Sequence, residues 1–174
     1  MTAAEPTPDQ LIAELHRLGI RHLATMTPPS DDVPLTPLRM LTSMAACPDA
    51  RVRSALVPLF LWRPDLAACV REAAAITTGQ ARAMVMCGYS AAVALEHQLA
   101  GALEHIRPAD APPLHDVFDQ DLGLVAAMSP IVRLEEVARR HAQLSGRDIN
   151  WRGTYEHAVA SALRAAEPAV EWSH

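Results

Sequence analysis

The densest cluster of titratable side chains in this chain lies between residues 115 and 121. It contains one imidazole and three carboxylates, from His115, Asp116, Asp119 and Asp121. Side chains of this kind at this density can bind a divalent cation. The glutamate that would complete a twelve-residue calcium loop is missing, so a solvated loop or a helix cap is the simpler interpretation. A metal-dependent enzyme, or a helical bundle that binds a small ligand, is the alternative hypothesis for function.

The other histidines lack the spacing of metal ligands on a helix. No His-x-x-x-His or Glu-x-x-His pair occurs, and His97 and Glu104 are too far apart along the helix to replace one. Further histidines fall in separate predicted helices or at their ends and can meet only through folding: His16, His22, His141 and His157. We therefore expect surface or boundary positions for them, and no metal or other cofactor.

A catalytic constellation is not visible in the sequence. There are only 7 glycines and no glycine-rich phosphate loop. The serines in predicted helices lack the strand-turn-helix context of a nucleophile elbow. Cys87 is flanked by apolar residues and is interpreted as an inert core thiol. We predict no catalytic residue, and these sequence features favour a protein that is not an enzyme.

Aromatic and arginine side chains at helix ends are the best candidates for contacts with another protein, because Trp, Tyr and Arg are enriched among interface hot spots. Trp151 and Tyr155 also fall on the apolar stripe of the last predicted helix, which equally predicts core packing. The candidate partner-binding residues are Arg51, Arg53, Trp62, Arg63, Trp151, Arg152 and Tyr155.

The composition predicts a helical protein that does not bind nucleic acid through bulk charge. Half of its 174 residues are apolar but only 4% are aromatic, and alanine, the best helix former, supplies much of the apolar content. A net charge of -5 disfavours nucleic acid as a partner. No signal-peptide pattern begins the chain, and the apolar run 83–95 is too short to span a membrane, so we expect a cytoplasmic location. Three cysteines without disulfide spacing fit a reducing compartment.

Hydrophobic periodicity predicts one all-α domain over residues 1–174, a bundle of about six or seven helices. Residues 1–6 are expected to be flexible, and the proline-rich stretches 27–36 and 107–116 are read as connections. Thr7, Thr36, Asp49, Ser129 and Asn150 are predicted N-caps, while Val117–Leu124 is ambiguous. The predicted helices run over about 8–19, 36–48, 49–62, 66–76, 80–106, 129–146 and 150–168.

Two of these helices carry unusual features. The helix over 49–62 is apolar on two sides, which indicates that it lies between other helices. Pro58 in its interior is expected to kink it, because a backbone hydrogen bond is lost there. The helix over 80–106 is the longest and contains small residues that allow a neighbour to approach closely.

The stretch from Asp49 to Ala55 reads Asp-x-x-Val-Arg-x-Ala and resembles the HEAT-repeat signature. The resemblance extends from Thr36 to Ala75 and implies a helical hairpin whose aspartate and arginine tie neighbouring hairpins together. HEAT repeats form protein-binding surfaces. A second copy is missing, and a solenoid needs about three or more stacked units, so we expect a single local hairpin. Solvated or salt-bridged side chains at Arg51 and Arg53 are the simpler alternative.

The chain as a whole also resembles uncharacterised bacterial helical proteins that are encoded beside nucleotidyltransferase-fold genes. The residues that carry this resemblance are 49–64, 89–93, 122–124 and 149–155. It implies a partner role, including restraint of a nucleotidyltransferase-like toxin, and no activity of the chain's own. The leading hypothesis is therefore a non-catalytic protein-interaction protein, with homo-oligomerisation left open.

Overall fold

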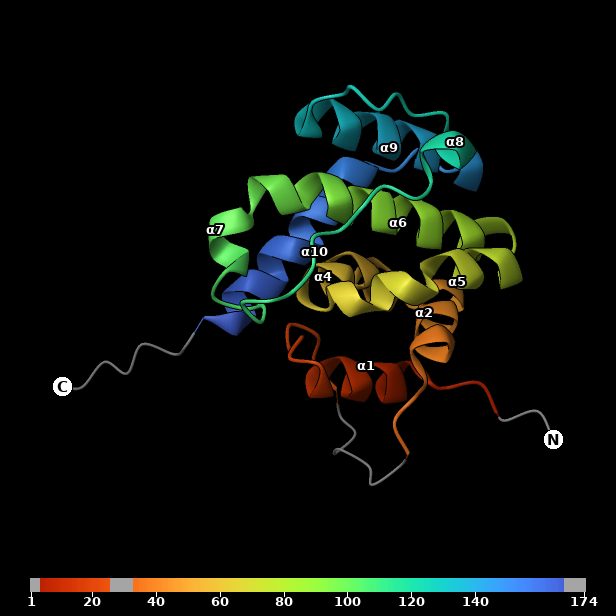
Figure 1. The fold of residues 1–174 in the computed structure, drawn as a ribbon. Helices are drawn as coiled ribbons and strands as arrows, with labels where there is room; N and C mark the ends of the chain where they lie inside the picture. Colours follow the sequence, from red (N-terminus) through yellow and green to blue (C-terminus); the bar gives the residue numbers. More distant parts are fainter. Residues whose placement is uncertain (1–3, 26–32, 168–174) are drawn as a thin grey trace.

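The computed structural model describes residues 4–25 and 33–167, and within these ranges the chain forms helices and no strand (Figure 1). This confirms the all-α class. The predicted flexibility of residues 1–3 and most of the 27–36 connection lie outside the described residues. Pro168, which is predicted to end the last helix, also lies outside them, and the helix ends at Ala166. The elements are α1 Pro8–Arg17, α2 Pro37–Ala46, α3 Ala50–Ser54, α4 Leu56–Trp62, the 3-10 helix η1 Pro64–Cys69, α5 Val70–Ile76, α6 Gly79–Gln98, α7 Ala100–Leu103, α8 Asp119–Leu122, α9 Pro130–Ser145 and α10 Trp151–Ala166.

Helix α6 is the centre of the structure. Every residue from 83 to 95 is buried, so the helix is covered on all sides. Its most extensive contacts are with α9 on one side and with α2, α4 and α5 on the other, while α10 crosses against α4 and α9 (Figure 1). A helix that is apolar all round belongs in a core. Among the described residues, no helix combines the length and the apolar character that a membrane span requires.

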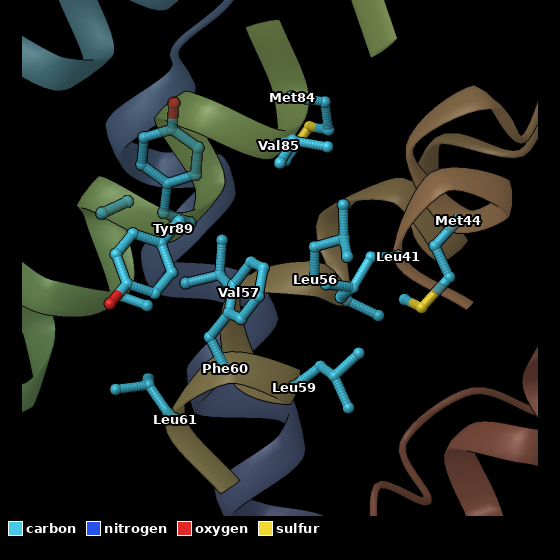
Figure 2. Close-up of a cluster of buried hydrophobic side chains, with 14 of the residues drawn as sticks. Leu41, Met44, Leu56, Val57, Leu59, Phe60, Leu61, Met84, Val85 and Tyr89 are labelled. Atoms are coloured by element: carbon cyan, nitrogen blue, oxygen red, sulfur yellow. The ribbon is translucent and has the colours of Figure 1, made fainter. Parts of the chain in front are cut away.

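The face of α6 that points toward α4 meets a continuous layer of aliphatic and aromatic side chains. Figure 2 shows Val57, Phe60 and Tyr89 at the centre of this layer, with Leu41 and Met44 of α2 at its edge. The rings of Phe60 and Tyr89 meet edge to face at 5.1 Å. Few aromatic residues therefore suffice for the core, because small side chains elsewhere let the helices approach.

The predicted N-caps form as expected. Thr7 accepts from the Gln10 amide while the Gln10 side chain accepts from the Thr7 amide, which completes a capping box. The remaining predicted caps also accept a backbone N–H of the first helical turn: Thr36, Asp49, Ser129 and Asn150. These starts depend on contacts within a few residues, so local sequence is sufficient to predict them.

Two predicted helices are not continuous α-helices in the structure, and one ambiguous stretch contains a helical turn. The helix over 49–62 breaks at Ala55 into α3 and α4, because Pro58 has no N–H to offer the carbonyl of Ser54. The helix over 66–76 begins in the 3-10 conformation as η1 and becomes α-helical only at Val70. The ambiguous stretch after Val117 contains the single turn α8.

The prediction of one helix from Gln80 to Ile106 is wrong. Helix α6 ends at Gln98, Leu99 leaves the helical conformation with φ -112° and ψ 12°, and α7 adds one short turn. Leu103 is buried, and Arg107 binds Glu96 and the carbonyl of Leu61, so the chain turns back onto the core after Gln98. The apolar period continues past the break, which is why periodicity alone misses it.

The HEAT-like stretch makes a turn between α2 and α3, but α2 packs mainly against α5 and α6. Asp49 caps α3 and pairs with Arg51 at 2.8 Å. Arg53 donates to the carbonyls of Cys47 and Pro48 at 2.6 and 2.8 Å. The motif therefore stabilises its own turn instead of tying one hairpin to the next.

Candidate functional site

The acidic cluster predicted as the alternative metal site is bound by an arginine. The side chain of Arg133 on α9 is 5% exposed and reaches the carboxylates of both Asp116 and Asp119. The distance from its Nη2 to Asp116 Oδ1 is 2.7 Å. Burial raises the pKa of Asp116, and the guanidinium of Arg133 opposes this shift. One of the two carboxylate charges that a cation would need is thus already balanced by an internal arginine.

The other two members of the predicted cluster do not join this arrangement. His115 and Asp121 are exposed, and the backbone carbonyl of His115 accepts a hydrogen bond from the Tyr89 hydroxyl at 2.8 Å. Among the described residues, no group of three or more His, Cys, Asp or Glu side chains could hold a metal ion. The geometry supports a braced loop and not a metal centre.

A second arginine of α9 lies against the end of the same loop. Gly123 closes α8 in the left-handed conformation, with φ 64°. A Cβ atom there would lie 2.8 Å from Nη2 of Arg140, so the glycine allows the guanidinium to approach the backbone. Arg133 therefore binds the acidic loop through ion pairs, and Arg140 lies close to the backbone at its end.

The proline-rich connection before this loop is anchored in a similar way. Glu96 of α6 accepts from the Leu114 amide at 3.0 Å and also binds Arg107. Arg107 donates in turn to the carbonyl of Leu61 in α4. Both charged side chains are close to nine-tenths buried, at 12% and 10% exposure. The pair joins three segments of the chain and leaves neither charge free for chemistry.

The aromatic residues of the last helix form a buried cluster with a histidine of α9. The Nδ1 atom of His141 and the hydroxyl of Tyr155 share a 2.6 Å hydrogen bond, and the imidazole stacks on Trp151 with ring centroids 3.5 Å apart. Burial lowers the pKa of His141 to about 3 and raises the pKa of Tyr155. His141 is therefore neutral across the physiological range and acts as a packed ring.

The predicted partner-binding residues divide into buried and paired groups. Tyr155 is fully buried and Trp62 is 5% exposed, so neither ring is available at the surface. Arg63 pairs with Asp65 at 2.8 Å and Arg152 pairs with Glu135 at 2.5 Å. The structure gives these residues, with Arg51 and Arg53 above, contacts within the fold.

An apolar surface lies instead where the chain enters α9. We call residues 125–132 the apolar segment. It contains no charged residue, and Val125, Ile131 and Val132 are 61%, 55% and 46% exposed. Hydrophobic periodicity predicts Ile131 on the buried face of its helix together with Leu134 and Val137. This prediction is wrong, because the buried face of α9 is formed by Arg133, Leu134, Val137 and His141.

One signal in the sequence could have revealed this surface. Ser129 caps α9 and Pro130 is its first residue, so Ile131 and Val132 occupy the second and third positions. Acidic side chains are favoured there by the helix dipole, and a glutamate at the third position would complete a capping box with Ser129. Helix α9 has no acidic residue in its first turn. Two exposed aliphatic residues thus occupy positions at which acidic residues would stabilise the helix.

Comparisons with known proteins identify no relative of this chain. No family model, no curated protein and no solved structure matches this chain.

Proposed function

We propose that the chain is a non-catalytic protein-interaction protein whose partner docks on the apolar segment 125–132. The observation that carries the proposal is the pair of exposed side chains at Ile131 and Val132, at positions where a helix gains stability from acidic residues. Exposed apolar surface without a structural role is typical of interaction sites. The charged clusters support the same conclusion, because Arg133, Glu96 and Arg107 are engaged in bracing the fold.

The class of partner comes from the sequence resemblance. We propose a nucleotidyltransferase-like protein, which this chain would bind and restrain. The free cysteines Cys47, Cys69 and Cys87 are compatible with the cytoplasm as the place of encounter.

The test is purification of the full chain from its native cells at low salt, followed by size-exclusion chromatography and mass spectrometry. The expected result is a second protein in stoichiometric amount, eluting with the chain and carrying a nucleotidyltransferase fold. Elution of the chain as a single component contradicts the proposal. A stoichiometric partner of another fold contradicts the partner class alone.

A pair of variants connects the partner to the surface. Ile131→Glu combined with Val132→Glu removes the exposed aliphatic groups and places acidic residues where α9 favours them, so the fold should be retained. Ile76→Glu changes another exposed aliphatic residue, 61% exposed at the end of α5. We expect the double variant to lose the partner and the control to keep it.

A further inference from the structure

Arg133 lies directly after the apolar segment and joins the two ends of the chain around it. Its guanidinium pairs with Asp119, 14 residues earlier in the sequence, and its Nη2 atom lies 2.7 Å from Oδ1 of Asp116. The chain between Asp119 and Arg133, residues 120–132, contains the whole apolar segment. Surface loops whose two ends lie close together are frequently functional. The ion pairs therefore hold the beginning of this stretch against its end.

We call residues 120–129 the arch, because the chain leaves α8, where Gly123 lies against Arg140 of α9, and returns to the start of that helix (Figure 1). The backbone hydrogen bonds of the arch are local. The Leu124 amide donates to the carbonyl of Asp119 at 2.8 Å, and the Met128 amide donates to that of Val125 at 3.3 Å. Within the described ranges, α8 packs extensively against no other helix. The backbone of the arch thus bonds to itself and leaves its place on α9 to side chains.

Buried leucines hold the first part of the arch. Leu122 and Leu124 are 2% and 9% exposed. Residues 125–127 and Ser129 are exposed and Met128 is half-buried, so residues 125–129 contain no fully buried anchor. This second part ends at α9, from which Arg133 reaches back to the start of α8. The leucines and the ion pairs together therefore define the path of the arch.

These ion pairs are suited to positioning because they are directional and largely shielded from water. The side chain of Arg133 is 5% exposed, and those of Asp116 and Asp119 are 35% and 25% exposed. Hydrogen bonds between charged groups are about twice as strong as neutral ones, and a guanidinium restricts their geometry. Partly buried pairs are also screened less by salt than exposed ones. The contact therefore favours one arrangement of α8 against α9.

We infer that Arg133, together with Asp116 and Asp119, is the positioning contact of the docking surface. The inference rests on the proposed function: the contact holds the arch in one arrangement before a partner arrives, so that the partner meets the apolar segment as a preformed surface. A surface that is ordered in advance binds with a smaller loss of conformational entropy. Removing the contact should therefore weaken partner binding even though no residue of the apolar segment changes.

The test compares two variants that each remove one buried set of charges. Arg133→Met with Asp116→Asn and Asp119→Asn removes the positioning contact and leaves no buried charge unpaired, a replacement that folds often tolerate. The control is Arg107→Met with Glu96→Gln, which removes the buried ion pair of the proline-rich connection, with side chains 10% and 12% exposed. Asp119→Asn alone is the milder variant, because Asp116 still neutralises Arg133. It should change the same measurements in the same direction, by a smaller factor.

Two measurements are made on each variant. Amide hydrogen exchange of the free chain is followed by mass spectrometry in residues 120–129, with α6 as the internal reference, and titration calorimetry gives the affinity for the co-purified partner. In the triple variant we expect exchange of the arch to rise, and affinity to fall, by at least about fivefold, the upper range for a partly exposed ion pair. The control should change neither quantity, because its ion pair lies outside the arch.

The outcomes separate the inference from the proposed function. Unchanged exchange of the arch overturns the inference, and so does faster exchange with unchanged affinity. Equal changes in the control variant also overturn it, since they indicate a general loosening of the fold. Retention of the partner by the Ile131→Glu and Val132→Glu double variant refutes the proposed function, and the inference with it, whatever the exchange of the arch shows.

Discussion

Helix α9 buries two polar side chains. Their surroundings compensate for the loss of hydration in different ways. Arg133, at 4% exposure, keeps its charge and is neutralised by Asp116 and Asp119. His141, at 1% exposure, gives up its charge and is enclosed by Tyr155 and Trp151. The guanidinium has no neutral form at accessible pH, so it requires carboxylates, whereas the imidazole only requires one hydrogen bond and a ring to stack on.

Function in this molecule is better sought outside these two regions. Both regions contain residue types that resemble an active site when seen in the sequence. In both, the side chains are engaged mainly with one another, although Arg133 Nε and Trp151 Nε1 have no hydrogen-bond partner among the described residues. The apolar segment differs because it contains no charged residue, and Ile131 and Val132 are 55% and 46% exposed.

The largest expected effect on the free energy of unfolding comes from protonation of the His141 imidazole. Its pKa is about 3 in the folded protein and 6.5 in a model peptide, so the unfolded chain binds more protons in between. Stability is then lost as the pH falls from about 6.5 toward 3, by roughly 4 to 5 kcal/mol at about 1.4 kcal/mol per pKa unit. Urea unfolding at a series of pH values measures this loss.

The variant His141→Phe isolates that effect from the carboxylates. At pH 7 it should be less stable than the parent by about 1 to 2 kcal/mol, because the Tyr155 hydroxyl loses its partner. Toward pH 4 it should become the more stable of the two, since phenylalanine does not titrate. A constant difference between the two proteins at every pH would show that His141 does not carry the acid sensitivity.

The second-largest expected effect on stability comes from removing the positive charge of Arg133. Arg133→Met leaves two carboxylates near each other without a cation and should cost about 2 to 3 kcal/mol, below the usual range for a buried pair because both aspartates are partly hydrated. Chemical denaturation at pH 7 gives the value. Adding Asp116→Asn and Asp119→Asn should recover part of the loss; no recovery would mean that packing, and not charge, dominates at Arg133.

The smallest expected effect tests the far end of the acidic loop. Gly123 and Gly146 both close helices with positive φ, 64° and 65°. Gly146→Ala meets no atom within 4 Å and should cost about 1 kcal/mol for the backbone alone. Gly123→Ala should cost about 2 kcal/mol, because its Cβ also displaces Arg140. Thermal unfolding of the two variants compares them, and equal values would remove Arg140 from the bracing of the loop.

The sequence is sufficient for what depends on neighbouring residues. The starts of helices at Thr7, Thr36 and Asn150 are predicted because each cap bonds to an amide within three residues. The division at Ala55 has its cause in Pro58, a local feature that the sequence also contains. The all-α class follows from the same local preferences summed along the chain.

What depends on distant residues is missed. The carboxylates at Asp116 and Asp119 look like metal ligands until Arg133 is placed between them. Periodicity also misplaces Ile131, because the period continues into the first turn of α9 while the core does not.

The central claim is that the apolar segment 125–132, and not the charged clusters, carries the interaction with a partner. Titration calorimetry of the co-purified partner measures this directly, with the parent chain, the Ile131→Glu and Val132→Glu double variant and the Ile76→Glu control. We expect the double variant to bind at least about thirty-fold more weakly, the loss of one hot spot of about 2 kcal/mol, and the control to bind as the parent does. Unchanged affinity in the double variant, with its fold intact, would contradict the claim.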